Sequence, residues 1–286
     1  MIPEYSLAYL TVLGLSPPRM VAAAAKAGYS YVGLRLHAVT TDEPRYPLHL
    51  NRSMLLETKH ELAATGVRVL DVELIRLTPW FDVHEHDALL DVSAELGARH
   101  LIAQGADANL DRVIDHFGQL CDAAAKRKLT ADIEFVTWTE TADLARAAAI
   151  VGAAARDNGG LLIDTLHFSR SHDDIAELAK LPRHWFHYAQ VCDAPSEPPK
   201  TLDGLIFAAR NERMFPGAGG LDLPGILGAL PAGIPYSLEI PTAALAKKVG
   251  LEECARLALE SAKDFFAAAG GRPLTSASAS RNRLHH

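Results

Sequence analysis

Short runs rich in β-branched residues alternate with alanine- and leucine-rich segments along nearly the whole chain. Such short apolar runs predict strands, and apolar positions that recur every three or four residues predict helices. The predicted strands cover residues 7–13, 31–36, 67–74, 100–103, 129–136, 161–166, 185–191 and 236–240. The predicted helices cover residues 17–27, 52–65, 84–96, 110–126, 141–154, 173–181 and 251–268. Each predicted strand is thus followed by a helix or by a long connection.

Repeated strand–helix units imply parallel strands joined by right-handed crossovers. Eight such units that close on themselves form a (β/α)8 TIM barrel, an α/β fold that typically takes about 250 residues in one domain. A doubly wound open sheet is the alternative, but its glycine-rich phosphate turn is missing, because the first strand is followed by Gly14-Leu15-Ser16-Pro17. We expect one domain over residues 1–270, a long loop after the seventh strand (193–235), and a flexible tail over residues 271–286.

Composition narrows the class of partner. Lys and Arg number 28 against 35 Asp and Glu, a net charge of −7, whereas duplex nucleic-acid binders normally carry a basic excess. No apolar run reaches the roughly 18 residues of a membrane span. The three cysteines are far apart in the sequence, and the first residues lack a basic leader, so a reducing, cytoplasmic location is expected. We therefore predict a small-molecule substrate, no nucleic acid and no membrane, with assembly as a homodimer or homotetramer.

Four oxygen-bearing side chains stand at the ends of the fifth to eighth predicted strands. They are Glu134, Asp164, Gln190 and Glu239. Adjacent strands of a barrel lie about 4.8 Å apart, so their ends can surround one point. Three carboxylates that converge in a cleft repel one another, and a divalent cation relieves this repulsion. The set contains only oxygen donors, which suits Mn²⁺ or Mg²⁺ better than a metal that prefers thiolates.

Other residues near these strand ends have two interpretations each. His167 either faces the same mouth or packs in the core. Arg213 precedes a glycine-rich turn that either closes over an anion or hydroxyls, or is an ordinary loop with a surface arginine. Glu140 either contacts the site or is an acid at a helix N-terminus, and Trp138 either walls the pocket or anchors a loop. Arg35, Asp71 and Glu73 end the second strand or lie on the third, but their spacing leaves their direction open.

Together these residues resemble a known family. The ordered set Glu134, Asp164-x-x-His167, His187-x-x-Gln190, Arg213-x-x-Pro216-Gly217-x-Gly219 and Glu239 is similar to the xylose isomerase-like TIM barrels, also called the AP endonuclease 2 type. This superfamily of sugar and sugar-phosphate isomerases and epimerases includes hydroxypyruvate isomerase, ketose 3-epimerases and inosose dehydratase. The resemblance covers most of the chain.

The resemblance implies roles for individual residues. It implies that Glu134, Asp164, Gln190 and Glu239 hold one divalent metal ion, Mn²⁺ or Mg²⁺ ahead of Co²⁺ or Zn²⁺. It further implies that Glu134 and Glu239 transfer protons and that His167 and Arg213 hold substrate oxygens. Glu140, Trp138 and His187 complete the expected substrate-binding set.

Departures from the family pattern bear on the substrate. The seventh-strand ligand is usually histidine in ketose epimerases, whereas Gln190 is as in the hydroxypyruvate isomerase group. The turn reads Pro-Gly-Ala-Gly, where an acid often takes the third place, and the stretch between Gln190 and Arg213 is longer than in the epimerases. Because no dense basic cradle for a phosphate is visible, we expect an unphosphorylated polyol, sugar or keto acid.

The predicted function is a metal-dependent isomerase or epimerase of carbohydrate metabolism. It would abstract a proton next to a carbonyl and form a metal-stabilised enediolate. A dehydratase, in which a β-hydroxyl leaves from the same intermediate, is the alternative that the same site serves. A non-catalytic sugar-binding barrel stays open. A DNA-repair endonuclease of the endonuclease IV type is disfavoured by the acidic charge and by the lack of an Asp-x-His pair after Gln190.

Overall fold

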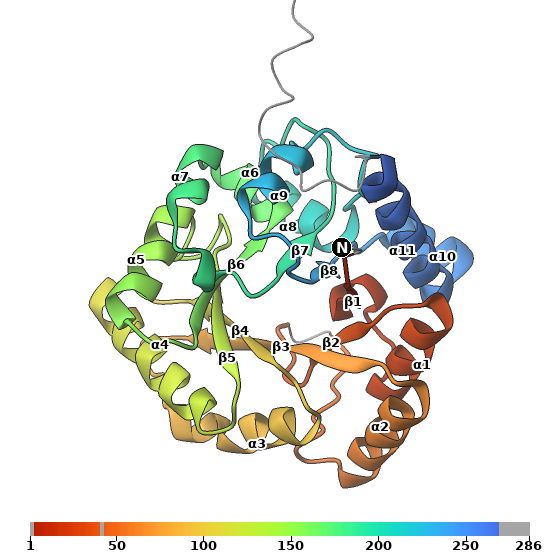
Figure 1. Cartoon of the computed structure of the whole chain (residues 1–286), viewed down its shortest axis with the longest axis horizontal. Helices are drawn as coiled ribbons and strands as arrows, with labels where there is room; N and C mark the ends of the chain where they lie inside the picture. The colour runs from red at the N-terminus through yellow and green to blue at the C-terminus, as the bar shows by residue number, and fades with distance from the viewer. Residues whose placement is uncertain (1–2, 41–42, 269–286) are drawn as a thin grey trace, which may run out of the picture.

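Eight parallel strands close into one barrel in the computed structural model, which describes residues 3–40 and 43–268 (Figure 1). Each strand pairs with its neighbours in sequence, and β8 pairs with β1. The strands are β1 (Tyr5–Leu7), β2 (Tyr31–Arg35), β3 (Arg68–Leu77), β4 (His100–Gly105), β5 (Thr130–Glu134), β6 (Gly159–Asp164), β7 (Ala189–Val191) and β8 (Tyr236–Leu238). The predicted (β/α)8 barrel is confirmed.

Helices form the ring around this barrel (Figure 1). The α-helices are α1 (Pro17–Ala27), α2 (Arg52–Thr65), α3 (Asp87–Glu95), α4 (Leu110–Ala125), α5 (Leu144–Ala154), α6 (Thr165–Ser171), α7 (Ile175–Lys180), α8 (Leu202–Asn211), α9 (Leu223–Ala229), α10 (Ala243–Val249) and α11 (Leu251–Ala268). Short 3-10 helices are η1 (Tyr9–Val12), η2 (Val83–His86) and η3 (Arg183–Trp185). None of the described helices is both long and apolar enough to cross a membrane.

Several boundaries differ from the prediction. The first strand ends at Leu7 and the chain turns into η1, where the Thr11 hydroxyl donates to Leu238 O and accepts from Ile240 N. These two bonds join η1 to the end of β8. The segment predicted as a long loop after β7 carries α8 and α9. The helices α6 and α10 were not predicted, and the predicted tail lies outside the described residues.

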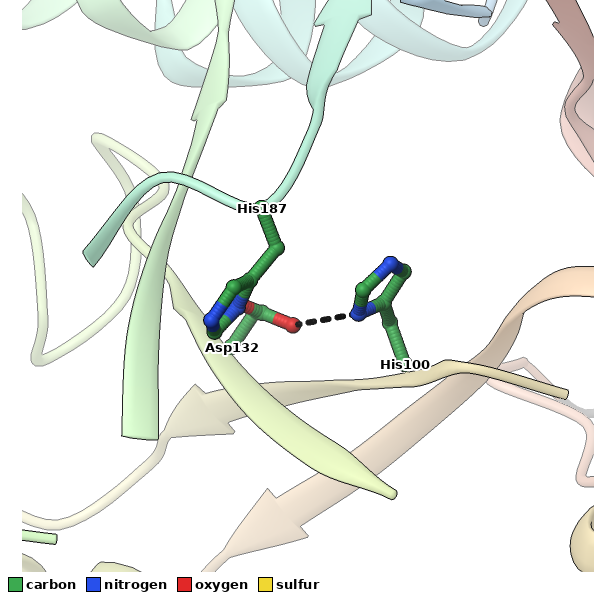
Figure 2. A group of neighbouring side chains, drawn as sticks. All are labelled: His100, Asp132 and His187. Atoms are coloured by element: carbon green, nitrogen blue, oxygen red, sulfur yellow. Dashed lines mark hydrogen bonds and ion pairs between the residues drawn. The ribbon is translucent and has the colours of Figure 1, made fainter. Parts of the chain in front are cut away.

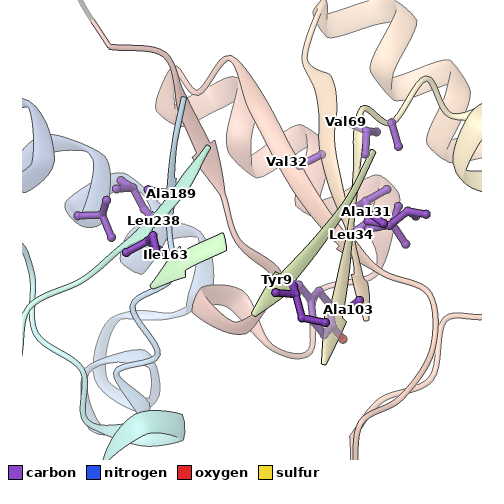
Figure 3. Packing of buried hydrophobic residues seen from close by; sticks show 14 of the residues in the cluster. Tyr9, Val32, Leu34, Val69, Ala103, Ala131, Ile163, Ala189 and Leu238 are labelled. Carbon is purple, nitrogen blue, oxygen red and sulfur yellow. The ribbon is translucent and has the colours of Figure 1, made fainter. Parts of the chain in front are cut away.

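Buried apolar side chains form two layers, one on each face of the strands. Outward-facing strand residues, among them Leu34, Ala131 and Leu238, pack against the helices (Figure 3). A smaller cluster built on Tyr31, Leu70, Ile102, Leu162 and Tyr188 fills part of the barrel interior. Because successive side chains of a strand point to opposite faces, inward positions beyond this inner cluster are available for polar groups.

Candidate metal and active site

A cavity of about 590 Å³ opens at the C-terminal ends of the strands. It is lined by three of the four predicted donors, namely Glu134, Gln190 and Glu239. All three are buried, and so is the fourth donor, Asp164, which ends β6. The barrel therefore brings together side chains from four successive strand ends, as the spacing along the sequence predicted.

The four donors lie in two contacting groups. Gln190 Nε2 donates to Glu239 Oε1 at 3.2 Å. Glu134 and Asp164 each place one oxygen, together with a ring nitrogen of His167, so that these atoms all lie within 4.8 Å of one another. The carboxylate of Asp164 is held at the start of α6, because its Oδ1 accepts hydrogen bonds from the backbone N–H groups of Leu166 and His167.

Arg213 binds two of these carboxylates. Its guanidinium is buried and lies 2.6 Å from Asp164 Oδ2 and 3.0 Å from Glu239 Oε2, and its Nε donates to Ala209 O. The sequence predicted that Arg213 holds a substrate oxygen, and in the structure its guanidinium is bound to these two carboxylates. The side chain of Arg213 lines the cavity, but its guanidinium is ion-paired with two of the candidate metal ligands. We therefore regard Arg213 as a residue that positions Asp164 and Glu239.

The glycine-rich turn after Arg213 also binds a group of the protein itself. The Asp193 carboxylate accepts from the backbone N–H groups of Gly217, Gly219, Leu221 and Ala194 at 2.8–3.1 Å. A β-carbon on Gly219 would lie 2.4 Å from Asp193 Oδ1 and from Ala194 O, so glycine is required at this approach. The expectation that this turn closes over a ligand anion is not supported, because Asp193 occupies these donors.

Three other predicted residues lie where a substrate would reach them. His167 and Trp138 line the cavity, and their rings meet edge to face with centroids 5.1 Å apart. Burial lowers the pKa of His167 to about 4, so its imidazole is neutral, and its Nδ1 has no hydrogen-bond partner among the described residues. Glu140 also lines the cavity but is exposed.

Electrostatics show an excess of buried negative charge. Burial and the charge of Asp164 raise the pKa of Glu134 to about 7, and burial raises that of Glu239 well above its ordinary value despite Arg213. Burial would also raise the pKa of Asp164, but the charge of Arg213 and hydrogen bonds lower it instead. One guanidinium thus does not compensate three carboxylates.

The residues present fit a divalent cation. The side-chain Oε1 of Gln190 is buried and accepts no hydrogen bond among the described residues, although a buried carbonyl normally has a partner. It belongs to an amide whose nitrogen is already bound to a carboxylate, so the free oxygen is the group left to coordinate. Three carboxylates and one amide oxygen are hard donors, which bind hard divalent cations.

Several residues of the site were not singled out from the sequence. Gln104, at the end of β4, donates to Glu134 Oε2 at 2.6 Å, and the strand-end rule used for the four donors would have found it. Arg35 is buried and bonded to Glu73 and Glu43, so Arg35 and Glu73, two of the three positions whose direction the sequence left open, face inward. Arg76 and Arg210 also line the cavity, and no sequence signal distinguishes them from surface arginines.

A second cluster lies at the opposite ends of the strands. There, His187 Nδ1 donates to Asp132 Oδ1 at 2.6 Å, and His100 lies 3.8 Å from Asp132 Oδ2 and 2.7 Å from Thr130 Oγ1 (Figure 2). The two imidazoles are stacked, with planes 10° apart. Because the Asp132 carboxylate already accepts a hydrogen bond from His187 at 2.6 Å, we treat this cluster as structural. His187 is not among the residues that line the cavity, so its contact with substrate stays a prediction that the cavity does not support.

Comparison with known proteins decides the family. The sequence model described as "Xylose isomerase-like TIM barrel" matches residues 21–263. The chain belongs to the xylose isomerase-like TIM barrel family.

Solved members of this fold are distant in sequence. The zinc-bound IOLI protein superposes with a TM-score of 0.77 at 19% identity, covering 93% of this chain and 98% of the other. The D-allulose 3-epimerase from Methylomonas sp. in complex with D-allulose gives a TM-score of 0.66 at 20% identity, with coverage of 92% and 96%. At these identities the likeness shows the shared xylose isomerase-like barrel and no particular reaction.

One curated relative has a higher sequence identity to this chain, but the match covers only part of each protein. The protein named 3-dehydroshikimate dehydratase from Pseudomonas aeruginosa (strain PAO1) is 33% identical over 130 residues, which are 44% of this chain. The matched stretch spans only 20% of that relative's length. Relatives of this xylose isomerase-like barrel thus include proteins named as an epimerase and as a dehydratase.

Proposed function

We propose that this protein is a divalent-metal-dependent enzyme that removes a proton next to the carbonyl of a hydroxy-keto compound and thereby isomerises or epimerises it. The observation that carries the proposal is that the buried carboxylates of Glu134 and Glu239 line one cavity of about 590 Å³ together with Gln190, whose Oε1 has no partner among the described residues. The buried carboxylate of Asp164 lies beside that of Glu134. A cavity of this volume takes a molecule of monosaccharide size.

The four strand-end residues are the proposed metal ligands, namely Glu134, Asp164, Gln190 and Glu239. A bound divalent cation supplies Lewis acidity that stabilises the negative charge that develops on a substrate oxygen. Mn²⁺ or Mg²⁺ suits the donor set, and the zinc in the IOLI structure adds Zn²⁺ to the metals to be tested. Arg213 holds Asp164 and Glu239 in place for this purpose.

The side chains of the chain itself move the proton. In the proposed scheme one of Glu134 and Glu239 removes the proton next to the carbonyl, and the same group or the other one returns a proton. General acid–base catalysis of this kind contributes roughly 10²–10⁴-fold in rate. Neutral His167 is the proposed hydrogen-bond partner for a substrate hydroxyl, because its Nδ1 is unpartnered among the described residues, and Trp138 forms the apolar wall beside it.

Dehydration is the second candidate, favoured by the match to the dehydratase. In that reaction the proton next to the carbonyl and the β-hydroxyl group leave together as one molecule of water, and a carbon–carbon double bond remains. The proton abstraction is common to both candidates, so the site alone does not separate them. The two differ in the product, since only dehydration creates a conjugated chromophore.

Deuterium exchange in D₂O tests the shared step. We would strip the protein with EDTA, reload it with Mg²⁺, Mn²⁺, Co²⁺ or Zn²⁺, and offer D-allulose, L-ribulose, D-fructose and 3-dehydroshikimate. Metal-dependent incorporation of deuterium next to the carbonyl, read by NMR and mass spectrometry, is the expected result. Growth of ultraviolet absorbance identifies dehydration, and a new ketose or aldose without absorbance identifies isomerisation or epimerisation.

Substitution of one carboxylate gives a second test, with a substitution at an exposed residue as its control. Glu239→Gln should still fold, although the loss of its ion pair with Arg213 changes its stability, and should lose about 10²–10⁴-fold in exchange rate. His60→Gln, on the exposed face of α2, should match the wild type. Full exchange in Glu239→Gln, or exchange that survives EDTA, would contradict the proposed function. A barrel that binds a sugar without exchanging its proton would likewise contradict it and support a binding protein.

A further inference from the structure

Two arginines lie at the outer end of the cavity, away from the carboxylate cluster. Its inner end carries the carboxylates described above. Two arginines also line it, Arg76 near the end of β3 and Arg210 in the last turn of α8. Arg76 is exposed and Arg210 is half-buried, so both belong to the outer end. A molecule in the cavity would therefore meet the carboxylate cluster at the inner end and these two guanidinium groups, together with the exposed Glu140, at the outer end.

These two arginines differ from the other two that line the cavity. Arg35 and Arg213 are buried and each is ion-paired to two carboxylates. Within the described ranges, 3–40 and 43–268, no carboxylate lies within ion-pair distance of Arg76 or Arg210. A guanidinium nitrogen of Arg76 donates a hydrogen bond to Val39 O at 3.4 Å. Among the described residues, no ion pair occupies the donors of these two arginines.

The two guanidinium groups are also close enough to influence each other. Partial burial lowers the pKa of Arg76, and the positive charge of Arg210 lowers it further, although the nearby carboxylate of Glu43 opposes this shift. Like charges brought together at a half-desolvated mouth repel, and an anion between them relieves this repulsion. Guanidinium groups bind carboxylate and phosphate through paired N–H donors, which makes an arginine pair a selective anion site.

We propose that the substrate carries an anionic group, a carboxylate or a phosphate, which Arg76 and Arg210 bind while the hydroxy-keto end of the substrate lies on the acidic floor. This inference rests on the proposed function for the position of the reacting end. It narrows the expected substrates to hydroxy-keto acids and sugar phosphates, and neutral sugars become poor substrates. Of the unphosphorylated compounds expected from the sequence, only the keto acids, which carry a carboxylate, then remain as substrates.

Binding of matched probes to the Mn²⁺-loaded protein tests the inference without turnover. The carboxylate arm compares 3,4-dihydroxybenzoate with catechol, which lacks only the carboxylate. The phosphate arm compares D-ribulose 5-phosphate with D-ribulose. Isothermal titration of the wild type should show that one charged probe binds about tenfold or more tightly than its neutral partner, since a hydrogen bond to a charged group is worth roughly 1.5–3 kcal/mol.

Arginine variants show whether that preference comes from this pair. In Arg76→Gln and Arg210→Gln the preference should fall several-fold each, and in the double variant it should approach unity while the neutral probe binds as before. Arg45→Gln is the control, because Arg45 is exposed on the neighbouring loop and does not line the cavity. Thermal unfolding of all variants checks folding, and the single variants suffice if the double variant unfolds.

The outcomes separate this inference from the proposed function. A charge preference that disappears with the two arginines supports the inference, and the arm in which it occurs identifies carboxylate or phosphate. Equal binding of charged and neutral probes in both arms, or a preference that survives the double substitution, overturns it. Deuterium exchange on the same preparations reports on the proposed function. Arginine-dependent binding without exchange would contradict only that function, and exchange without arginine dependence would contradict only this inference.

Discussion

The guanidinium of Arg213 lies 2.6 Å from Asp164 Oδ2, and both side chains are fully enclosed by the barrel rim. A buried cation between carboxylates compensates charge only in part, because Glu134 and Glu239 keep raised pKa values beside it. Arg213 and a divalent cation would therefore both neutralise the negative charge of Glu134, Asp164 and Glu239.

Arg213→Gln should destabilise the metal-free protein by about 3–5 kcal/mol, the typical cost of removing one partner from a buried ion pair. Saturating Mn²⁺ should restore part of this loss and should stabilise the variant more than the wild type, since the variant has more uncompensated carboxylate. Urea unfolding with EDTA and with Mn²⁺ measures both effects. Arg183→Gln is the control, because Arg183 donates to backbone carbonyls and not to carboxylates. Equal stabilisation of all three proteins by Mn²⁺ would contradict the shared role.

Gln190→Met should weaken Mn²⁺ binding by about 100-fold, because it removes an oxygen donor while keeping the volume of the side chain. Gln104→Met is the matched control: it removes an amide that donates to Glu134 but that is not a proposed ligand. We expect at most about a tenfold loss there. Competition with a fluorescent chelator and elemental analysis give the two affinities. If the two variants bound Mn²⁺ equally well, Gln190 would be the wrong fourth ligand.

Strand ends were the part of the site most accessible to sequence reasoning. A polar residue that interrupts an apolar run, such as Asp164 after Leu161-Leu162-Ile163, marks where a strand reaches the mouth, and the closed barrel brings such ends together. Helices with clear caps were predicted equally well, as α2 begins after Asn51 and ends at Gly66. These features are local, so a single sequence contains them.

Long-range partners could not be predicted in this way. Nothing near Asp193 in the sequence indicates that it accepts hydrogen bonds from the turn at residues 217–221, and nothing beside Arg213 indicates that it pairs with Asp164. His187 was misplaced because β7 begins at Ala189, so this histidine precedes the strand and lies at its far end. Arg76 and Arg210 line the same cavity only because β3 and α8 both border it.

The Asp193 carboxylate should stabilise the loop that carries Arg213. Asp193→Asn replaces one of two accepting oxygens with an amide N–H₂ that faces backbone donors, so we expect a loss of about 1–3 kcal/mol in the free energy of unfolding. Asp222→Asn is the control, since Asp222 accepts one bond, from Gly225 N at the start of α9, and should cost at most about 1 kcal/mol. Urea unfolding measures both. Hydrogen exchange at Gly217 and Gly219 should accelerate in Asp193→Asn only, and unchanged exchange there would contradict this role.

The pair formed by His187 and Asp132 makes a prediction about pH. Burial alone would lower the pKa of His187, but the hydrogen bond and charge of Asp132 outweigh it and raise that pKa. The native state then binds this proton more tightly than the unfolded chain, so the stabilisation is complete below the ordinary value of about 6.5 and is lost as pH rises through the native pKa. The pKa of neighbouring His100 is lowered to about 4, chiefly by burial, so it stays neutral above pH 6 and does not contribute.

His187→Gln should therefore be less stable than the wild type at pH 6, and the difference should shrink by pH 9. Urea unfolding at several pH values between 6 and 9 gives this difference directly. His60→Gln, on the exposed face of α2, is the control variant for these measurements. The amide introduced in place of His187 keeps a donor for Asp132 but carries no charge, so the pH-dependent part isolates the ion pair from the hydrogen bond. A constant difference across the range would mean that His187 is neutral in the folded protein and that the cluster is held by hydrogen bonds alone.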